Sequence, residues 1–389
     1  MGKVSQPTIC IAGHRYYTEK QGGVELQTRY IGDILAGAGW KVAFLSPSLN
    51  KKKGREEINE NISVWWYPHF SFNFQVPRDL LEGMLEDISP YVFYQRGRGQ
   101  LTGNNFILQY ARKKSIPYVF AFSSDPDLDM HYELKSTIRS YKPLWKKIVL
   151  IPYAMLLDNA MSNILKKADY IVVQHEEQAD LVKKKLHKTA NMLRTVHHEL
   201  KREVNKSEQK IVLWVNNYRP LKQGEVFVDL ARQCKNLNCG FVMVYGRTKH
   251  EYIVPVLKKA QDVNNLTLIG EISYESAEKL MEESSLFVNT SSFEGFPNTF
   301  IQAWLRETPT ASLNVNPGGV LTREKIGFCS GNFEQMVKDV TFLIENDEER
   351  ISMGKRARAY AEKEHGFEHN KDKIADFFSK IVSKPQFRN

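Results

Sequence analysis

The sequence predicts an α/β protein built from two successive doubly wound domains with parallel sheets. Short apolar runs alternate with amphipathic helical stretches along the chain, which is the pattern of strands and crossover helices in such sheets. At 389 residues the chain is long enough for two domains of ordinary size. The hydrophobic pattern gives way to charge over residues 201–209. We therefore expect one domain at 1–205 and another at 206–365, with the closing helix at 366–389 joining the first.

Each predicted strand is a short apolar run bounded by polar or turn residues. In the first half, strands are expected at 8–12, 41–46, 63–66, 91–94, 118–122 and 170–173. Amphipathic helices are expected between them, at 24–38, 78–88 and 104–114. In the second half, strands are expected at 210–215, 240–245, 266–269, 286–289 and 310–313, with long charged helices from residue 333 onward. Two such domains place a cleft at the carboxyl ends of their strands, where ligands bind.

Composition narrows the class of protein further. An apolar fraction of 42% and a charged fraction of 25% are those of an ordinary soluble protein. The first residues lead directly into a strand and no run approaches 18 apolar residues, so we expect a cytoplasmic protein without a membrane span. The cysteines lack metal-binding spacing, which favours a reducing compartment and argues against zinc or a disulfide framework: Cys10, Cys234, Cys239 and Cys329.

The positive charge is concentrated in the first half. Residues 1–205 hold 29 Lys+Arg against 21 Asp+Glu, and residues 206–389 hold 25 against 24, which together give the net charge of +9. Such a surface suits either anionic lipid headgroups or nucleic acid. We find no RRM, KH or zinc-finger signature, so nucleic acid is not expected as a partner.

The segment 142–167 favours lipid. Its apolar core, 148–157, is too short to span a bilayer, but Trp145 and the flanking lysines suit a helix lying in a membrane interface. A core helix of the first domain with a basic, solvent-exposed end is an equal alternative. A peripheral position at the inner face of a membrane is therefore left open beside the cytoplasmic one.

The most informative window is 291–308, SSFEGFPNTFIQAWLRET. A strand-like run ends in a polar turn that carries Glu294, Gly295 and Pro297, and a helix is expected from Thr299 to Arg306. Glycine allows close backbone approach, and proline and asparagine suit a helix start. Unpaired N–H groups at such a start attract an anion, and Glu294 would complete a site for a phosphate that also carries hydroxyls. An ordinary strand–turn–helix is the alternative.

This window resembles the donor-binding motif of retaining glycosyltransferases of family four, which have the GT-B fold of two Rossmann-like domains facing a central cleft. The family pattern is E-G-x-P-x-x-x-x-E, and this chain has Gln302 in place of the second glutamate. The resemblance implies that Glu294 lies by the donor sugar and that residue 302 meets the ribose hydroxyls. It also implies donor contacts at Phe296, Pro297, Asn298 and Thr299. A glutamine loses the charge-assisted bond, so weaker or altered nucleotide binding is expected.

Two further loops gain meaning from the resemblance. Gly22 and Gly23 precede the helix at 24–38, where their N–H groups could meet a phosphate, and the family carries a glycine-rich loop at this place. In WVNNYRPLKQG, 214–224, Arg219 and Lys222 follow a strand and supply a fork and a point charge for a diphosphate. The family holds the leaving nucleoside diphosphate with such a pair. A plain flexible or charged loop is the alternative at each place.

The loop SSDPDLD, 123–129, contains D-x-D twice, at Asp125, Asp127 and Asp129. Carboxylates suit a divalent cation, but short D-x-D matches are common and the fold that the chain resembles is metal-independent. A polar role for Asp125 near the sugar or acceptor is preferred, and no metal site is expected. Many family members carry a histidine at about this loop, and this chain has Ser123–Ser124–Asp125 instead.

Weaker signals surround these loops. The segments at 268–271, with Gly270, and 245–247, with Gly246, are expected to frame the nucleotide. The loop at 316–327 is either a floor below the nucleotide or a surface turn. Arg96 either meets an anionic acceptor or caps a strand end.

The sequence thus predicts a metal-independent glycosyltransferase that needs no cofactor and moves a sugar from a nucleotide sugar, with retention, to a glycan or lipid-linked acceptor. Cell-surface polysaccharide biosynthesis is the expected setting. On the family's scheme the leaving phosphate takes the acceptor's proton, so catalysis is electrostatic and falls to Arg219, Lys222, Glu294 and Asp125. Two alternatives are a nucleotide-sugar epimerase and a non-catalytic binding or scaffold protein. Gln302 and the missing histidine are the features that support the second.

Overall fold

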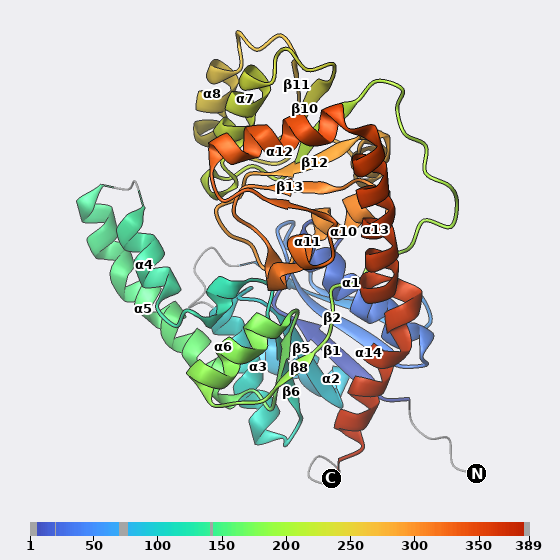
Figure 1. Cartoon of the computed structure of the whole chain (residues 1–389). Helices are drawn as coiled ribbons and strands as arrows, with labels where there is room; N and C mark the ends of the chain where they lie inside the picture. Colours follow the sequence, from blue (N-terminus) through green and yellow to red (C-terminus); the bar gives the residue numbers. More distant parts are fainter. Residues whose placement is uncertain (1–5, 20, 70–76, 141–142, 385–389) are drawn as a thin grey trace. The chain divides into compact units, whose positions relative to one another are not determined.

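The computed structural model describes residues 6–19, 21–69, 77–140 and 143–384. The chain forms two compact units, one of Met1–Thr195 with Asn370–Asn389 and one of Val196–His369. Figure 1 shows both, with labels on most of their helices and strands. Each unit is an α/β domain with a largely parallel sheet, so the predicted fold class is confirmed.

The sheet of the first unit has the strand order β3-β4-β2-β1-β5-β6-β7-β8 among the described residues. Neighbouring strands run parallel there, except that β3 is antiparallel to β4. The order reverses between β1 and β5, so this unit is doubly wound and its topological switch point lies between those strands. The strands are β1 (Thr8–Ala12), β2 (Lys41–Ser48), β3 (Gly54–Glu57), β4 (Ile62–Pro68), β5 (Val92–Arg96), β6 (Tyr118–Ala121), β7 (Tyr170–Val173) and β8 (Ala190–Met192).

Helices pack on both faces of this sheet, as the crossover connections of a doubly wound fold require. The returning helix at the chain end belongs to this unit from Asn370 onward, and the ring of Phe378 packs edge-on against Trp40 and Tyr94. The helices are α1 (Gly23–Gly37), α2 (Arg78–Ile88), α3 (Leu101–Lys113), α4 (Tyr132–Arg139), α5 (Leu144–Lys167), α6 (Glu176–Leu186) and α14 (Phe367–Val382), with a 3₁₀ turn, η1, at Asp125–Leu128.

All six strands that the apolar runs predict in the first half are present, with ends shifted by a few residues. Two further strands, β3 and β8, lack the pattern that would reveal them. All four residues of β3 are exposed, and β8 is three residues long without a buried side chain. Edge strands of this kind pair through their backbones and need no apolar face.

The second unit has the strand order β11-β10-β9-β12-β13-β14, and its described strands are parallel. Numbered from β9, this is the order 3-2-1-4-5-6 of the Rossmann fold, with the switch point between β9 and β12. The strands are β9 (Ile211–Val215), β10 (Gly240–Val244), β11 (Leu266–Ile269), β12 (Leu286–Asn289), β13 (Thr310–Ser312) and β14 (Gly327–Cys329). The five strands predicted in this half are all present.

Two apolar layers cover the faces of this second sheet. Along β9, Trp214 faces one layer with Phe227, while its neighbour Leu213 faces the other with Phe287 and Trp304. This alternation follows from the two-residue repeat of a strand. The helices that supply the layers are α7 (Gly224–Gln233), α8 (His250–Lys259), α9 (Tyr274–Glu283), α10 (Asn298–Trp304), α11 (Val320–Arg323), α12 (Phe333–Glu345) and α13 (Asp347–His365), with 3₁₀ turns η2 (Pro220–Lys222) and η3 (Pro317–Gly319).

The division between the units falls at Thr195/Val196, earlier than the predicted 205/206, and the return to the first unit begins at Asn370 instead of 366. The charged stretch near residue 205 belongs to the second unit because its charged side chains bind residues of that unit. The ammonium of Lys206 donates to Ser284 O at 2.8 Å and Thr308 Oγ1 at 2.7 Å, and Arg202 pairs with Glu282. The interruption of the hydrophobic pattern at 201–209 therefore did not mark the boundary between the two units.

Helix α5 is longer than its predicted apolar core of 148–157. By length and composition this 24-residue helix could cross a membrane, and it is the one such helix among the described residues. The core of its own unit, however, contains Ala160, Met161, Ile164 and Leu165 from its second half. The second half is therefore a core helix, while the first half is largely exposed.

Candidate functional site

The two most informative windows of the sequence meet at the switch point of the second unit. The loop after β9, 216–223, and the loop after β12, 290–297, are joined by hydrogen bonds to main-chain carbonyls. Thr290 Oγ1 donates to Lys222 O at 2.7 Å, and Ser292 N donates to Leu221 O at 2.9 Å. Because β9 and β12 are neighbours in the sheet, segments about seventy residues apart in sequence form one surface.

An ion pair lies at the centre of this surface. Lys222 Nζ is 2.8 Å from Glu294 Oε2, and the two side chains are only 17% and 15% exposed. The other carboxylate oxygen of Glu294 accepts hydrogen bonds from Asn289 Nδ2 at 2.9 Å and Ser291 Oγ at 2.7 Å. Glu294 is therefore fixed by three partners, and it fixes the ammonium of Lys222 in turn.

Arg219 lies in the same loop as Lys222, as the N-cap residue just before η2, with its backbone extended at φ −141° and its side chain exposed. Within the described part of the chain, no hydrogen bond or ion pair holds its guanidinium. The next turn is tight, because Gln223 has a left-handed backbone with φ +47°. The loop thus presents one held cation and one unheld cation, which suits an anionic ligand with more than one charged group.

The helix after Glu294, α10, begins at Asn298, one residue before the predicted start, and follows Pro297. Asn298 Oδ1 is 3.0 Å from His197 Nε2, so this side chain contacts the start of its own unit. Burial lowers the pKa of His197 to about 4, which leaves the ring neutral at ordinary pH. Phe296 is buried against His365 and Trp304, with ring centroids at 4.5 and 6.0 Å. Thr299, next to Asn298, is partly exposed.

Gln302, which replaces the second glutamate of the family pattern, lies on α10 and is buried. Its Nε2 donates to the hydroxyl of Tyr274 at 3.0 Å. The structure thus gives this side chain a partner within the protein, at the first residue of α9. A ligand hydroxyl would meet the Gln302–Tyr274 pair, in place of the carboxylate that the family carries.

The remaining predicted donor residues of this unit lie at the same sheet edge. Gly246, after β10, has φ +45°, and a Cβ there would lie 2.5 Å from Asn217 Oδ1, so the position requires glycine. Arg247 N donates to that same oxygen at 3.0 Å. Gly270 follows β11, and Tyr245 OH would lie 3.6 Å from a Cβ there. These loops all follow the carboxyl ends of their strands, as the Rossmann rule expects of a ligand site.

In the first unit, Gly22 and Gly23 lie in the loop between β1 and α1. Gly22 is the N-cap of α1 and its carbonyl accepts the first helical bond, from Leu26 N at 2.9 Å. A Cβ at Gly22 would lie 2.4 Å from a carboxylate oxygen of Glu25, so the turn is close-packed. This loop starts at the switch point of its unit, beside the loop after β5, where Gln100 N donates to Gly13 O at 3.0 Å.

Asp125 begins η1, after β6, where Gln178 Nε2 donates to its Oδ1 at 2.9 Å. Burial raises the pKa of Asp125, but the contacts with His175 and Gln178 outweigh burial and hold it below its usual range. The other two aspartates of this loop are held elsewhere. Asp127 accepts from Ser123 N at 2.7 Å, and Asp129 pairs with Lys135 at 2.8 Å.

Each of these three carboxylates thus binds a different residue of the protein. Among the described residues, no group of three or more His, Cys, Asp or Glu side chains is placed to hold a metal ion. Arg96, the other candidate of this unit, is buried and donates to Thr195 Oγ1 at 3.1 Å, which makes it a link between strand β5 and the end of the unit.

Sequence reasoning missed His175, which precedes α6 directly after strand β7. The ring is 3% exposed, neither of its nitrogens has a hydrogen-bond partner among the described residues, and Nε2 lies 3.8 Å from Asp125 Oδ1. The rule that found the other loops, a polar residue at the carboxyl end of a parallel strand, would have selected it. Asn289, Ser291 and Tyr274 were missed because they act through other side chains.

Residues 197–360 match the family model of glycosyl transferases group 1. A curated relative from Haemophilus influenzae, described as an uncharacterized glycosyltransferase, is 27% identical over 215 residues. That alignment covers 51% of this chain and 58% of the relative, so the match spans little more than half of that protein.

Solved structures match over more of the chain. Sucrose-phosphate synthase from Thermosynechococcus elongatus has a TM-score of 0.76 at 15% identity and covers 97% of this chain and 99% of its own. WaaG, a glycosyltransferase involved in lipopolysaccharide biosynthesis, has a TM-score of 0.68 at 12% identity and covers 95% and 99%. TarM of S. aureus, solved with UDP and sugar ligands, has a TM-score of 0.59 at 15% identity over 79% and 59%.

Two doubly wound units, each with a Rossmann-type strand order, define the GT-B class of fold for this chain. The match to the family model of glycosyl transferases group 1, residues 197–360, falls within its second unit. The narrower placement in family four, from the motif at Glu294, stays a prediction.

Proposed function

We propose that this protein is a retaining glycosyltransferase that takes its sugar from a nucleotide sugar. The observation that carries the proposal is the Lys222–Glu294 pair, held at the switch point of a group 1 domain with Arg219 beside it. Glu294 can accept hydrogen bonds from sugar hydroxyls, while Lys222 and Arg219 can bind phosphate. A nucleotide sugar requires both kinds of group. The TarM structure, which contains UDP, supports the nucleotide part by analogy of fold.

The chemistry of this proposal is electrostatic. As the bond between the sugar and the diphosphate breaks, negative charge grows on the leaving phosphate, and Arg219 and Lys222 stabilise it. Glu294, fixed by Asn289 and Ser291, orients the hydroxyls of the donor sugar. The leaving phosphate takes the acceptor's proton, so no protein nucleophile and no metal ion are needed.

The first unit is proposed to serve the acceptor. Asp125 and the buried His175 would face hydroxyls of the sugar or the acceptor, and the turn at Gly22–Gly23 would lie against phosphate. A glycan or lipid-linked acceptor of cell-surface polysaccharide synthesis fits this role, with the enzyme in the cytoplasm or peripheral at the inner membrane face. WaaG, which shares the fold, acts in lipopolysaccharide biosynthesis and supports this setting by analogy.

The experiment is a survey of donors with the purified protein. Nucleotide sugars are incubated with and without candidate glycan acceptors in EDTA, and release of nucleoside diphosphate and the new anomeric proton signal are followed by NMR. The proposal expects diphosphate release from one donor and a product with the donor's anomeric configuration. An inverted product would refute retention, a product epimerised without any acceptor would favour an epimerase, and binding of a donor without turnover would favour a scaffold.

A further inference from the structure

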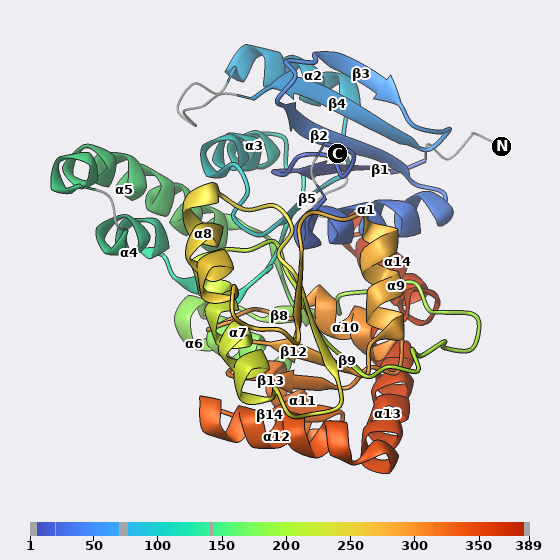
Figure 2. The same cartoon turned by 90° about the horizontal axis from the view of Figure 1, so that it is seen from above.

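The hairpin of α4 and α5 carries a concentration of exposed apolar side chains. Figures 1 and 2 show the two helices side by side, extending away from the sheet of their own unit. Trp145 and Val149 are 64% and 69% exposed. Around them the side chains that are also exposed are Ile138, Leu144, Ile148, Met155 and Leu156. We call residues 138–140 and 143–156 the hairpin tip. A soluble surface rarely gathers so many large apolar groups without a partner.

The tip is basic as well as apolar. Between Glu133 and Asp158 the sequence has no acidic residue, and the described part of the tip contributes three cations: Arg139, Lys146 and Lys147. Lys146 lies over the ring of Trp145, 5.1 Å from its centroid. The ammonium of Lys147 donates to Ile138 O at 2.7 Å, across the hairpin. Apolar groups interleaved with cations that have long stems are the composition of helices that lie in the headgroup region of a membrane.

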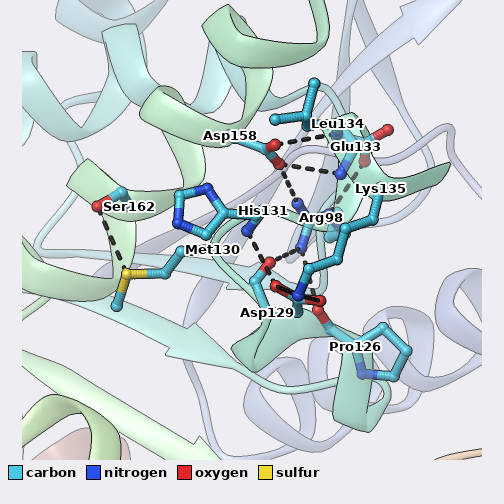
Figure 3. A network of polar contacts seen from close by, with 10 residues as sticks. All are labelled: Arg98, Pro126, Asp129, Met130, His131, Glu133, Leu134, Lys135, Asp158 and Ser162. Atoms are coloured by element: carbon cyan, nitrogen blue, oxygen red, sulfur yellow. Dashed lines mark hydrogen bonds and ion pairs between the residues drawn. The ribbon is translucent and has the colours of Figure 1, made fainter. Parts of the chain in front are cut away.

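The base of the hairpin, in contrast, is polar and firmly held (Figure 3). Arg98 Nε is 3.1 Å from Glu133 Oε1, and its terminal nitrogens donate to Asp158 Oδ1 at 3.3 Å and Pro126 O at 3.1 Å. Asp158 also accepts from the backbone N–H groups of Glu133 and Leu134, at 3.0 Å each. The acidic residues nearest the tip thus have their partners within the protein.

The same helix does not span a bilayer in this fold. Its second half lies in the core of its unit, and only the part from Leu144 to Leu156 is available. These 13 residues extend about 20 Å at 1.5 Å per residue, less than the roughly 30 Å of a hydrocarbon core. Lying in the interface is the geometry that this length permits.

We propose that the hairpin tip docks into the headgroup region of a bilayer that contains anionic lipid. The positive charge of the hairpin tip indicates which partner covers it. A second copy of the chain using the same face would bring basic tips together, because a two-fold interface pairs a patch with itself. Anionic headgroups complement the cations while Trp145, Ile148 and Val149 enter the acyl boundary. If the proposed function holds, this contact brings the enzyme to the surface that contains a lipid-linked acceptor.

Trp145 itself reports the contact. The chain has six tryptophans, and the other five are buried: Trp40, Trp65, Trp66, Trp214 and Trp304. Vesicles of phosphatidylglycerol and phosphatidylcholine should shift the protein's emission to the blue, and Trp145→Phe should abolish the shift. Vesicles of phosphatidylcholine alone should produce little shift, and co-sedimentation should follow the same order.

Two matched variants test the tip. Val149→Glu should weaken partition onto the anionic vesicles by at least roughly tenfold, since it removes an apolar contact and adds repulsion. Ile351→Glu, on α13 of the other unit and 52% exposed, should change partition less than twofold. Release of nucleoside diphosphate from a soluble donor should be the same in both variants, so a failure of docking and a failure of the proposed activity are separate results.

Three outcomes would overturn the proposal. The first is the absence of binding to either kind of vesicle by the folded protein. The second is binding that Val149→Glu leaves unchanged. The third is a dimer in analytical ultracentrifugation that Val149→Glu dissociates, which would make a second copy the occupant of the tip.

Discussion

Replacing Lys222 with alanine should remove most of the donor turnover while the second unit stays folded. The ammonium is the cation held nearest to Glu294, at 2.8 Å, and it is proposed to face the charge that grows on the leaving phosphate. Removal of one such preorganised group costs about 10²–10³ in kcat, or roughly 2.7–4 kcal/mol in the barrier.

The stability of the fold should change far less. The hydrogen bond from Thr290 Oγ1 ends on the main-chain carbonyl of Lys222, so alanine retains it. Glu294 keeps its bonds from Asn289 and Ser291. What is lost is one ion pair between partly exposed groups, about 1 kcal/mol in the free energy of unfolding. The variant therefore separates catalysis from stability by a wide margin.

The assay measures initial rates of nucleoside diphosphate release at saturating donor, beside urea unfolding of the same preparations. Lys259→Ala is the matched control, because Lys259 also forms an ion pair, with Asp229, on helices away from the switch point. The control should keep its turnover. A folded Lys222→Ala protein with unchanged kcat would refute the role of Lys222 at the diphosphate.

Three further predictions concern other contacts. Gln302→Glu should tighten nucleotide binding by roughly tenfold in calorimetry, because a charged acceptor for hydroxyls replaces a neutral one. The hydroxyl of Tyr274 can donate to the new carboxylate. Unchanged affinity would place residue 302 away from the ribose. The folded pKa of His197, about 4, lies below the ordinary 6.5, so the unfolded chain takes up the proton first as the pH falls below 6.5. Stability should therefore drop by about 2 kcal/mol between pH 7 and pH 5, and His197→Gln should flatten that dependence in urea unfolding; an equal slope in both proteins would contradict the neutral buried ring. Arg98→Met should cost about 3 kcal/mol of stability in the first unit, since it leaves Asp158 without its cation; a loss below 0.5 kcal/mol would show that the network contributes little.

The sequence predicted the loops of the site better than their contacts. Glu294 follows an apolar run and precedes turn residues, so local pattern indicated that window, while the role expected of Arg219 and Lys222 came from the family resemblance. That Lys222 and Glu294 form a pair depends on β9 lying beside β12, and strand order is a property of the whole sheet. Pattern within one window carries no information about that order.

Other features depended on packing that the sequence does not display. The charged stretch near Lys206 marked the predicted boundary, yet its ammonium donates to Arg306 O at 2.7 Å, within the second unit. Helix α5 changes from exposed to buried along its length while its composition stays apolar. The core interpretation therefore describes its second half, and the interfacial role of its first half stays a prediction. His175 was missed because a lone histidine has no motif, and only the strand before it indicates its place.

Thermal shift with nucleoside diphosphates and nucleotide sugars, in EDTA, tests the central claim most directly. A ligand at a hundred times its Kd should add roughly 2.7 kcal/mol to the free energy of unfolding, which gives a clear rise in melting temperature. The proposed site predicts that the melting temperature rises selectively with nucleotides of one base. This rise should persist in EDTA and be strongly reduced in Lys222→Ala. No response to any nucleotide, or an equal response in Lys222→Ala, would contradict a nucleotide-sugar site at the β9–β12 switch point.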